Sequence, residues 1–221
     1  MIRRIEKLKH PKAIVFDWDN TLVNTWPVIH KSLEETYLAF DKKPMTMDEV
    51  KSNVKYSLRD SFPDIFHDEW EKARDIFYDT FEKVHLEELQ KLEGADIFLN
   101  DLKSLDIPIS LVSNKTGKYL RQEAKHLEWD ELFHRMIGAG DAENDKPAID
   151  PLYLALEETN LELNEAIWFV GDSEVDIKIA ENAGCTGILL HFNEVPTDMA
   201  ACPHQVHPDF DSLIREIRQF Y

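Results

Sequence analysis

Four groups of polar residues in this chain each follow a short apolar run. The first group is Asp17, Asp19 and Thr21, directly after residues 13–16. The later groups are Ser113-Asn114-Lys115, Lys146 and Gly171-Asp172-Ser173. Carboxylates gathered in one place repel one another, and a hard cation with oxygen ligands compensates for this. Lysines and hydroxyls suit a phosphoryl group, whose transfer depends on positioning and charge stabilisation. A carboxylate can itself attack and form an aspartyl-phosphate.

The apolar runs have the length of β-strands, and helix-like segments separate most of them. The predicted strands are residues 13–16, 107–112, 136–137, 166–170 and 187–190. The predicted helices between them include residues 118–127, 151–159 and 174–183. Unbroken apolar runs that alternate with helices indicate parallel strands buried on both faces. Ligands bind beyond the carboxyl ends of such strands, so we expect the four polar groups to converge there.

Residues 26–92 interrupt this alternation and contain no convincing strand. Their clearest segment has apolar residues at steps of three and four, which predicts one face of an amphipathic helix: Trp70, Ala73, Phe77, Phe81 and Val84. We interpret the region as a helical domain inserted after the first strand. The predicted fold class is therefore α/β, with a Rossmann-like parallel sheet in residues 1–25 and 93–221 and a helical insert in residues 26–92. A further helix is expected over residues 212–220, near the end of the sequence.

The composition narrows the possible partners. With 43 acidic and 25 basic residues the net charge is −18, which argues against nucleic acid. An anionic substrate then requires local positive charge, from a metal ion and a lysine. No apolar run approaches the roughly 20 residues of a membrane helix, and the start of the sequence does not resemble a secretory signal.

Cysteine and histidine usage adds little chemistry. Two cysteines, Cys185 and Cys202, fit a reducing compartment, so we expect a cytoplasmic protein. His204 and His207 have no evident third ligand and are interpreted as surface residues rather than a metal pair. The sequence does not indicate an oligomeric state.

The motif series resembles the four motifs of the haloacid dehalogenase-like hydrolases. It reads Asp17-x-Asp19-x-Thr21, Ser113-Asn114, Lys146 and Gly171-Asp172-Ser173-x-x-Asp176, in the family's order and across nearly the whole chain. The resemblance implies a Mg²⁺-dependent phosphatase whose substrate is a small phosphomonoester. It also implies that residues 26–92 form a helical cap domain.

The same resemblance assigns roles to individual residues. Asp17 is the expected nucleophile, and Asp19 the expected acid and base. Mg²⁺ is expected on the Asp17 carboxylate, the Asp19 main-chain carbonyl and the Asp172 carboxylate. Phosphoryl oxygens are expected to be bound by Ser113, Asn114 and Lys146, of which Lys146 also screens the charge of Asp17.

Three further residues keep two interpretations each. Asp176 either supports the metal site or caps a helix together with Ser173. Thr21 either donates to the phosphate or braces its own loop. Lys115 either belongs to the site or points to solvent, as most lysines do, so it is a weaker candidate for the site than its neighbours Ser113 and Asn114.

Several segments resemble the phosphoglycolate phosphatase-like branch of the family: residues 17–25, 112–115, 146–153, 170–183 and the cap stretch 57–63. Arg59 in that stretch is the predicted contact for a substrate carboxylate, because a guanidinium pairs with it through two hydrogen bonds. An exposed helix arginine is the other interpretation. Two alternative functions stay open: a phosphosugar mutase of the same superfamily and a non-catalytic phosphoaspartyl binding module.

Overall fold

The computed structural model describes residues 8–53, 58–191 and 199–221. The chain forms two compact units, one of residues 1–23 with 91–221 and one of residues 24–90. We call them the core unit and the inserted unit and describe each by itself.

The core unit is built on a six-stranded sheet in which every neighbouring pair is parallel, in the order β5-β4-β1-β6-β7-β8. The strands are β1 (Ala13–Phe16), β4 (Ile109–Thr116), β5 (Met136–Ala139), β6 (Ile167–Gly171), β7 (Thr186–Leu190) and β8 (Gln205–His207). All residues of β1, β6 and β7 are buried, as expected of strands covered on both faces. The predicted α/β fold class is confirmed.

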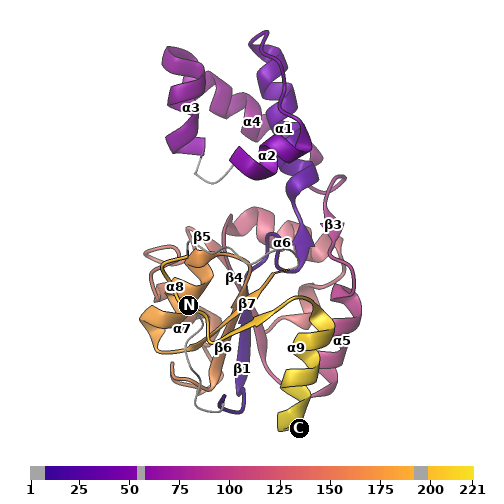
Figure 1. Cartoon of the computed structure of the whole chain (residues 1–221), viewed down its shortest axis with the longest axis vertical. Helices are drawn as coiled ribbons and strands as arrows, with labels where there is room; N and C mark the ends of the chain where they lie inside the picture. The colour runs from indigo at the N-terminus through magenta and orange to yellow at the C-terminus, as the bar shows by residue number, and fades with distance from the viewer. Residues whose placement is uncertain (1–7, 54–57, 192–198) are drawn as a thin grey trace. The chain divides into compact units, whose positions relative to one another are not determined.

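Helices cover both faces of this sheet. They are α5 (Ala95–Ser104), α6 (Gly117–His126), α7 (Asp150–Ala155), α8 (Glu174–Ala183) and α9 (Phe210–Ile217), with short 3-10 turns η2 (Asp130–Leu132) and η3 (Arg218–Phe220). In Figure 1, α5 and α9 lie on one side of the strands and α7 and α8 on the other. The helix predicted over residues 151–159 is shorter: it ends at Ala155, where Leu156 leaves helical geometry at φ −102° and ψ 1°, and Glu158 further on has a positive φ of 67°. Among the described residues, no helix has the length and apolar character needed to cross a membrane.

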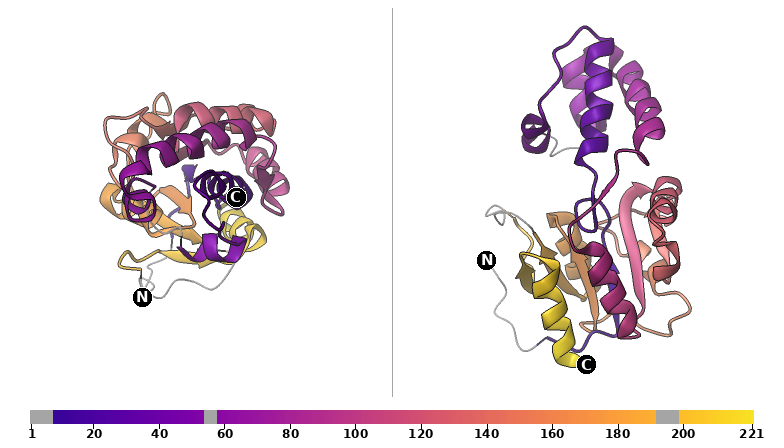
Figure 2. Two further views of the ribbon diagram at one scale, coloured as in Figure 1. Left: turned by 90° about the horizontal axis from the view of Figure 1, so that it is seen from above. Right: turned by 90° about the vertical axis from the view of Figure 1, so that its right-hand side faces the viewer.

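The inserted unit is helical, as predicted. It contains α1 (Trp26–Ala39), α2 (Met47–Asn53), α3 (Leu58–Phe66), the turn η1 (His67–Glu69) and α4 (Trp70–Val84). Helices α1 and α4 lie side by side (Figure 2). The predicted apolar face of α4 forms its core, with Ala73, Phe77 and Phe81 buried. Phe77 packs edge-on against Phe62 of α3, with ring centroids 6.0 Å apart.

The chain passes between the units through two short strands, which the sequence analysis did not predict. They are β2 (Val23–Asn24) and β3 (Gln90–Lys91), which pair in a two-stranded sheet. The Asn24 side chain donates a hydrogen bond to Gln90 Oε1 at 3.2 Å. Strands of two residues are too short to show an alternating apolar pattern, so the sequence carried no signal for them.

The interpretation of His207 as a surface residue was wrong. His207 ends β8 and is 7% exposed, with Nδ1 3.2 Å from Ser212 Oγ and Nε2 2.9 Å from Gln205 Oε1. His204 is partly buried, and its Nδ1 accepts a hydrogen bond from the Gly187 amide at 3.0 Å. Both histidines therefore attach the last strand to its surroundings.

Candidate active site

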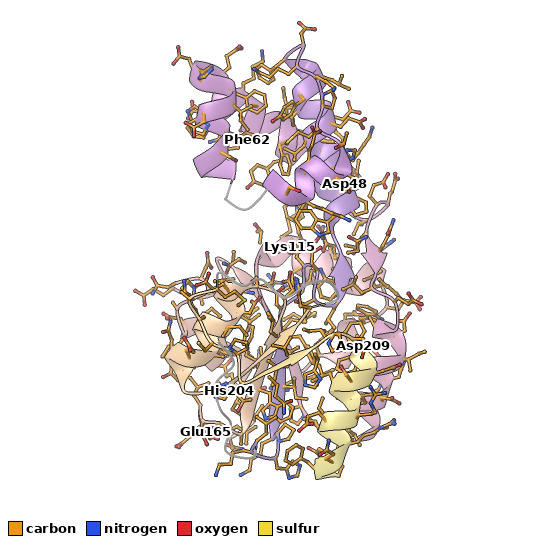
Figure 3. The ribbon with its side chains drawn as sticks, viewed as in Figure 1. Asp48, Phe62, Lys115, Glu165, His204 and Asp209 are labelled. Atoms are coloured by element: carbon orange, nitrogen blue, oxygen red, sulfur yellow. The ribbon has the colours of Figure 1, made fainter. Side chains whose placement is uncertain are left out.

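Three of the four predicted polar groups lie at or near the carboxyl ends of three neighbouring strands, β4, β1 and β6. Phe16, the last residue of β1, pairs with Leu111 of β4 on one side and with Val170 of β6 on the other. Strand β6 ends one residue further, at Gly171, whereas β4 continues to Thr116. The amide of Asp17 donates to Val170 O at 2.9 Å, which fixes the first residue beyond β1. In Figure 3, Lys115 lies at this end of the core unit and Glu165, just before β6, at the opposite end.

Lys146 joins the Asp17 carboxylate to a second acidic group. Its ammonium donates to Asp17 Oδ1 at 2.5 Å and to Asp176 Oδ1 at 2.7 Å, and its side chain is 2% exposed. The buried Thr21 hydroxyl donates to the other Asp17 oxygen at 3.2 Å. Burial raises the pKa of Asp17 to about 7, against the lowering effect of Lys146; the Asp176 and Asp19 carboxylates add to the rise.

The structure confirms that Asp176 caps a helix, which is one of the two roles that the sequence left open, while its support of a metal site stays a prediction. It is the third residue of α8, and its Oδ2 accepts from the Ser173 amide at 3.0 Å and from the Ser173 hydroxyl at 2.5 Å, which completes a capping box. Its Oδ1 binds Lys146, so one oxygen starts the helix and the other enters the site. Gly171 makes room for this side chain, since a Cβ there would lie 2.3 Å from Asp176 Cγ.

The donor set fits a hard divalent cation. Ligating oxygens of Asp17, Asp172 and Asp176 lie within 4.8 Å of one another. Burial is the largest of the effects that raise the pKa of Asp172 well above its usual value, and the negative charges of Asp17 and Asp176 add to it. Carboxylate oxygens at this spacing are the ligands that Mg²⁺ uses in proteins. The spacing makes Asp176 a possible ligand beside Asp17 and Asp172, and coordination by these residues and by the Asp19 main chain stays a prediction.

The Asp19 carboxylate points to a second lysine, which the sequence analysis had ranked low. Lys115 Nζ lies 2.7 Å from Asp19 Oδ1 and 2.5 Å from Glu123 Oε2, and its side chain is only 6% exposed. Glu123 is fully buried in α6 and also accepts from Trp18 Nε1 at 2.7 Å. Sequence reasoning missed Glu123, although its position three residues after Leu120 places an acid on the apolar face of the helix.

Ser113 and Asn114 lie at an irregular end of β4. The pairing of β4 with β5 shifts register between Val112 and Thr116, and such a shift re-aims the side chains beyond it. Ser113 is 4% exposed, and its Oγ accepts from the Lys115 amide at 3.1 Å. The Asn114 amide group donates to the Lys146 main-chain oxygen at 3.1 Å, which links two of the predicted motifs.

Arg59 is the one predicted site residue that cannot be compared with the structure. Its backbone belongs to α3, but its side chain lies outside the described residues.

The sequence profile of the haloacid dehalogenase-like hydrolases matches residues 14–190. The chain belongs to this family. It is 27% identical over 199 residues to a putative pyrophosphatase PpaX of Clostridium perfringens, covering 90% of this chain and 91% of that protein. A phosphoglycolate phosphatase of Photorhabdus laumondii is 26% identical over 223 residues, covering 95% and 94%. The fold matches a putative phosphatase from Clostridium difficile with a TM-score of 0.85 at 17% identity, over 95% of this chain and 99% of that one.

Membership of the haloacid dehalogenase-like hydrolases confirms the resemblance drawn from the motifs. The structure brings all core-unit residues that carried it to one end of the sheet, and it adds two unpredicted contacts, Lys115 with Asp19 and Glu123 with Lys115. At this end, five carboxylates face two ammonium groups: those of Asp17, Asp19, Glu123, Asp172 and Asp176 against Lys115 and Lys146.

Proposed function

We propose that this chain is a Mg²⁺-dependent phosphatase that hydrolyses a small phosphomonoester through an aspartyl-phosphate on Asp17. The observation that carries the proposal is the buried Asp17 carboxylate, paired with Lys146 and next to Asp172 and Asp176. A carboxylate so placed has a cationic neighbour and a metal-binding group beside it, which are the requirements for attack on an anionic phosphoryl group.

In the first half-reaction, an Asp17 oxygen attacks phosphorus and forms a P–O bond. The bond from phosphorus to the leaving oxygen breaks, and that oxygen takes a proton from the Asp19 carboxyl group. Proton donation of this kind accelerates a reaction by about 10²–10⁴-fold. Lys146 offsets the repulsion between Asp17 and the incoming phosphate.

In the second half-reaction, water attacks the phosphorus of the aspartyl-phosphate. The Asp19 carboxylate accepts a proton from this water, the bond between phosphorus and Asp17 breaks, and inorganic phosphate leaves. Asp19 regains in this step the proton it gave in the first, so the cycle balances.

Mg²⁺ is assigned to Asp17, Asp172 and Asp176, with the Asp19 main-chain carbonyl as an additional ligand. When bound, the ion supplies positive charge for the phosphoryl oxygens and for the crowded carboxylates. Ser113 and Asn114 are assigned to the phosphoryl oxygens. Thr21, which donates to Asp17 in the structure, is assigned to the same group when a phosphate is bound.

For the substrate we propose a 2-phosphoglycolate-like phosphomonoester, chosen by the inserted unit acting as a cap. The two relatives named above for phosphoglycolate and pyrophosphate hydrolysis are almost equally similar to this chain. Pyrophosphate is therefore the second candidate. Arg59 is the proposed contact for a substrate carboxylate: Arg59→Ala should raise KM for 2-phosphoglycolate much more than for phenyl phosphate. Equal changes would remove Arg59 from the substrate site.

The experiment that tests the function is phosphate release from 2-phosphoglycolate, pyrophosphate and other small phosphate esters, with and without Mg²⁺. Wild type should release phosphate only with the metal, and Asp17→Asn should be inactive. Conversion of a hexose phosphate without phosphate release would favour the mutase. A stable phosphoenzyme without turnover would favour the binding module.

A further inference from the structure

Each of the two aspartates after β1 is held by a buried lysine and a fully buried helix carboxylate. Asp17 pairs with Lys146, which also binds Asp176 of α8. In the same way, Asp19 pairs with Lys115, which also binds Glu123 of α6. The proposed function gives a role to each of Asp17, Lys146 and Asp176. It gives none to Lys115 and Glu123.

Lys115 and Glu123 form a buried ion pair. The Lys115 ammonium lies within 2.7 Å of both carboxylates, and the Glu123 side chain is 0% exposed. A buried carboxylate is tolerated only when it is paired and hydrogen-bonded. Glu123 satisfies that need with Lys115 Nζ at 2.5 Å and Trp18 Nε1 at 2.7 Å, both on Oε2. The negative charges of Asp19 and Glu123 raise the pKa of Lys115 despite its burial, so the ammonium stays charged.

Glu123 therefore acts on Asp19 through two routes. Its hydrogen bond fixes the indole of Trp18, the residue just before Asp19, and that indole is itself fully buried against Trp129 and Phe133. Its ion pair fixes the ammonium that binds Asp19 Oδ1. The first route concerns the main chain next to Asp19, and the second places an ammonium 2.7 Å from Asp19 Oδ1.

We propose that Glu123 and Lys115 are positioning residues for Asp19, holding one carboxylate oxygen so that the other is presented to the leaving group. The proposal rests on the proposed function, because it needs Asp19 to act as acid and base. A purely structural bridge between α6 and the loop after β1 would stabilise the fold but would have no effect on the leaving group.

The test compares two substrates with different needs for an acid. Nitrophenolate leaves without protonation, whereas the alkoxide of an alkyl phosphate must be protonated as it leaves. We would measure kcat/KM for p-nitrophenyl phosphate and for the alkyl phosphate that wild type hydrolyses fastest. Glu123→Gln keeps the shape of the side chain and removes the charge. It should lower kcat/KM for the alkyl phosphate by about 10-fold more than for the nitrophenyl ester. This is a fraction of the about 10²–10⁴-fold acceleration that proton donation by an acid provides.

Controls separate this role from general damage. Asp141→Asn removes another carboxylate that pairs with α6, through Arg121, and should leave the ratio of the two substrates unchanged. If Glu123→Gln folds poorly, the double variant Lys115→Met/Glu123→Gln removes both buried charges together. It should show the same loss of preference for the alkyl phosphate.

Asp19→Asn sets the scale for complete loss of the acid. An equal decrease on both substrates in the folded variants, or none, would overturn the positioning role. If Asp19→Asn itself hydrolyses both esters with the wild-type ratio, the acid–base role in the proposed function has failed and the positioning role fails with it.

Discussion

Replacing Gly171 by alanine should displace the Asp176 side chain from the site. The new Cβ would lie 2.3 Å from Asp176 Cγ, 2.4 Å from its Cβ and 2.5 Å from Oδ2. Carbon atoms in contact prefer about 3.5–4.0 Å, so the Asp176 side chain would have to retreat by about 1 Å. That movement would break its contacts with Lys146 at 2.7 Å and with the Ser173 amide at 3.0 Å.

The magnitude follows from these contacts. Overpacking of this kind costs about 1–3 kcal/mol, and hydrogen bonds lost from a charged group add about 1–3 kcal/mol. We expect the free energy of unfolding to fall by about 2–6 kcal/mol, which for a chain of this size lowers Tm by about 4–24 °C. Thermal unfolding followed by circular dichroism measures this directly.

Two comparisons make the Gly171→Ala experiment decisive. Gly187→Ala changes the neighbouring strand β7, where the nearest atom would be Ala180 Cβ at 3.1 Å, and should cost much less. In an Asp176→Gly background all three clashing atoms are absent, so Gly171→Ala should there cost far less than in wild type. The reasoning is refuted if the cost of Gly171→Ala is the same with and without the Asp176 side chain.

Three further outcomes are expected. Saturating Mg²⁺ should raise Tm of the wild type, by the equivalent of about 2.7 kcal/mol at 100 times Kd. Asp172→Asn should lose most of this shift, and an unchanged shift would contradict the assigned ligand set. Burial lowers the pKa of His207 below its ordinary value. Above pH of about 6.5, histidine is neutral in both the folded and the unfolded chain, whereas below it the unfolded chain binds the proton first. The contribution of His207 to stability should therefore fall as pH decreases from about 6.5, and urea midpoints of His207→Asn should show a smaller decrease than wild type; parallel pH curves would refute this. Burial also raises the pKa of Cys185 to about 11, so the native protein should react with a thiol reagent at Cys202 and, only after unfolding, at Cys185. Rapid native labelling of Cys185, located by mass spectrometry, would show that it is accessible.

The sequence predicted those elements whose signals are local. Strand β1 was predicted at its observed bounds, because an unbroken apolar run is what a fully buried strand requires. Helix α8 was predicted at residues 174–183, since Ser173 caps its start and Gly184 ends it in the left-handed conformation at φ 65°. Strand β8 was missed, because only Val206 in its three residues is apolar.

The limits of prediction at the site have a different cause. The aspartates follow buried strands, so their placement could be predicted from order along the chain. The surroundings of Lys115 could not, because its burial depends on Glu123 in a separate helix. The capping role of Asp176 could be predicted from the neighbouring Ser173, whereas the bond of its other oxygen to Lys146 could not, because Lys146 lies in a distant part of the sequence.

The pairing of β2 with β3 has a consequence for how such a chain can be modified. Paired strands lie about 4.8 Å apart, so residues 24–90 leave the core unit and return to it at adjacent points. The loop-closure cost of an inserted segment grows only slowly with its length, by about 0.6 kcal/mol for each doubling. The inserted unit can accordingly be exchanged for a different one, as a cassette, while β1, β4 and β6 keep the aspartates and lysines in register. Under the function proposed above, in which the inserted unit chooses the substrate, such an exchange would change selectivity without changing the residues that carry the chemistry.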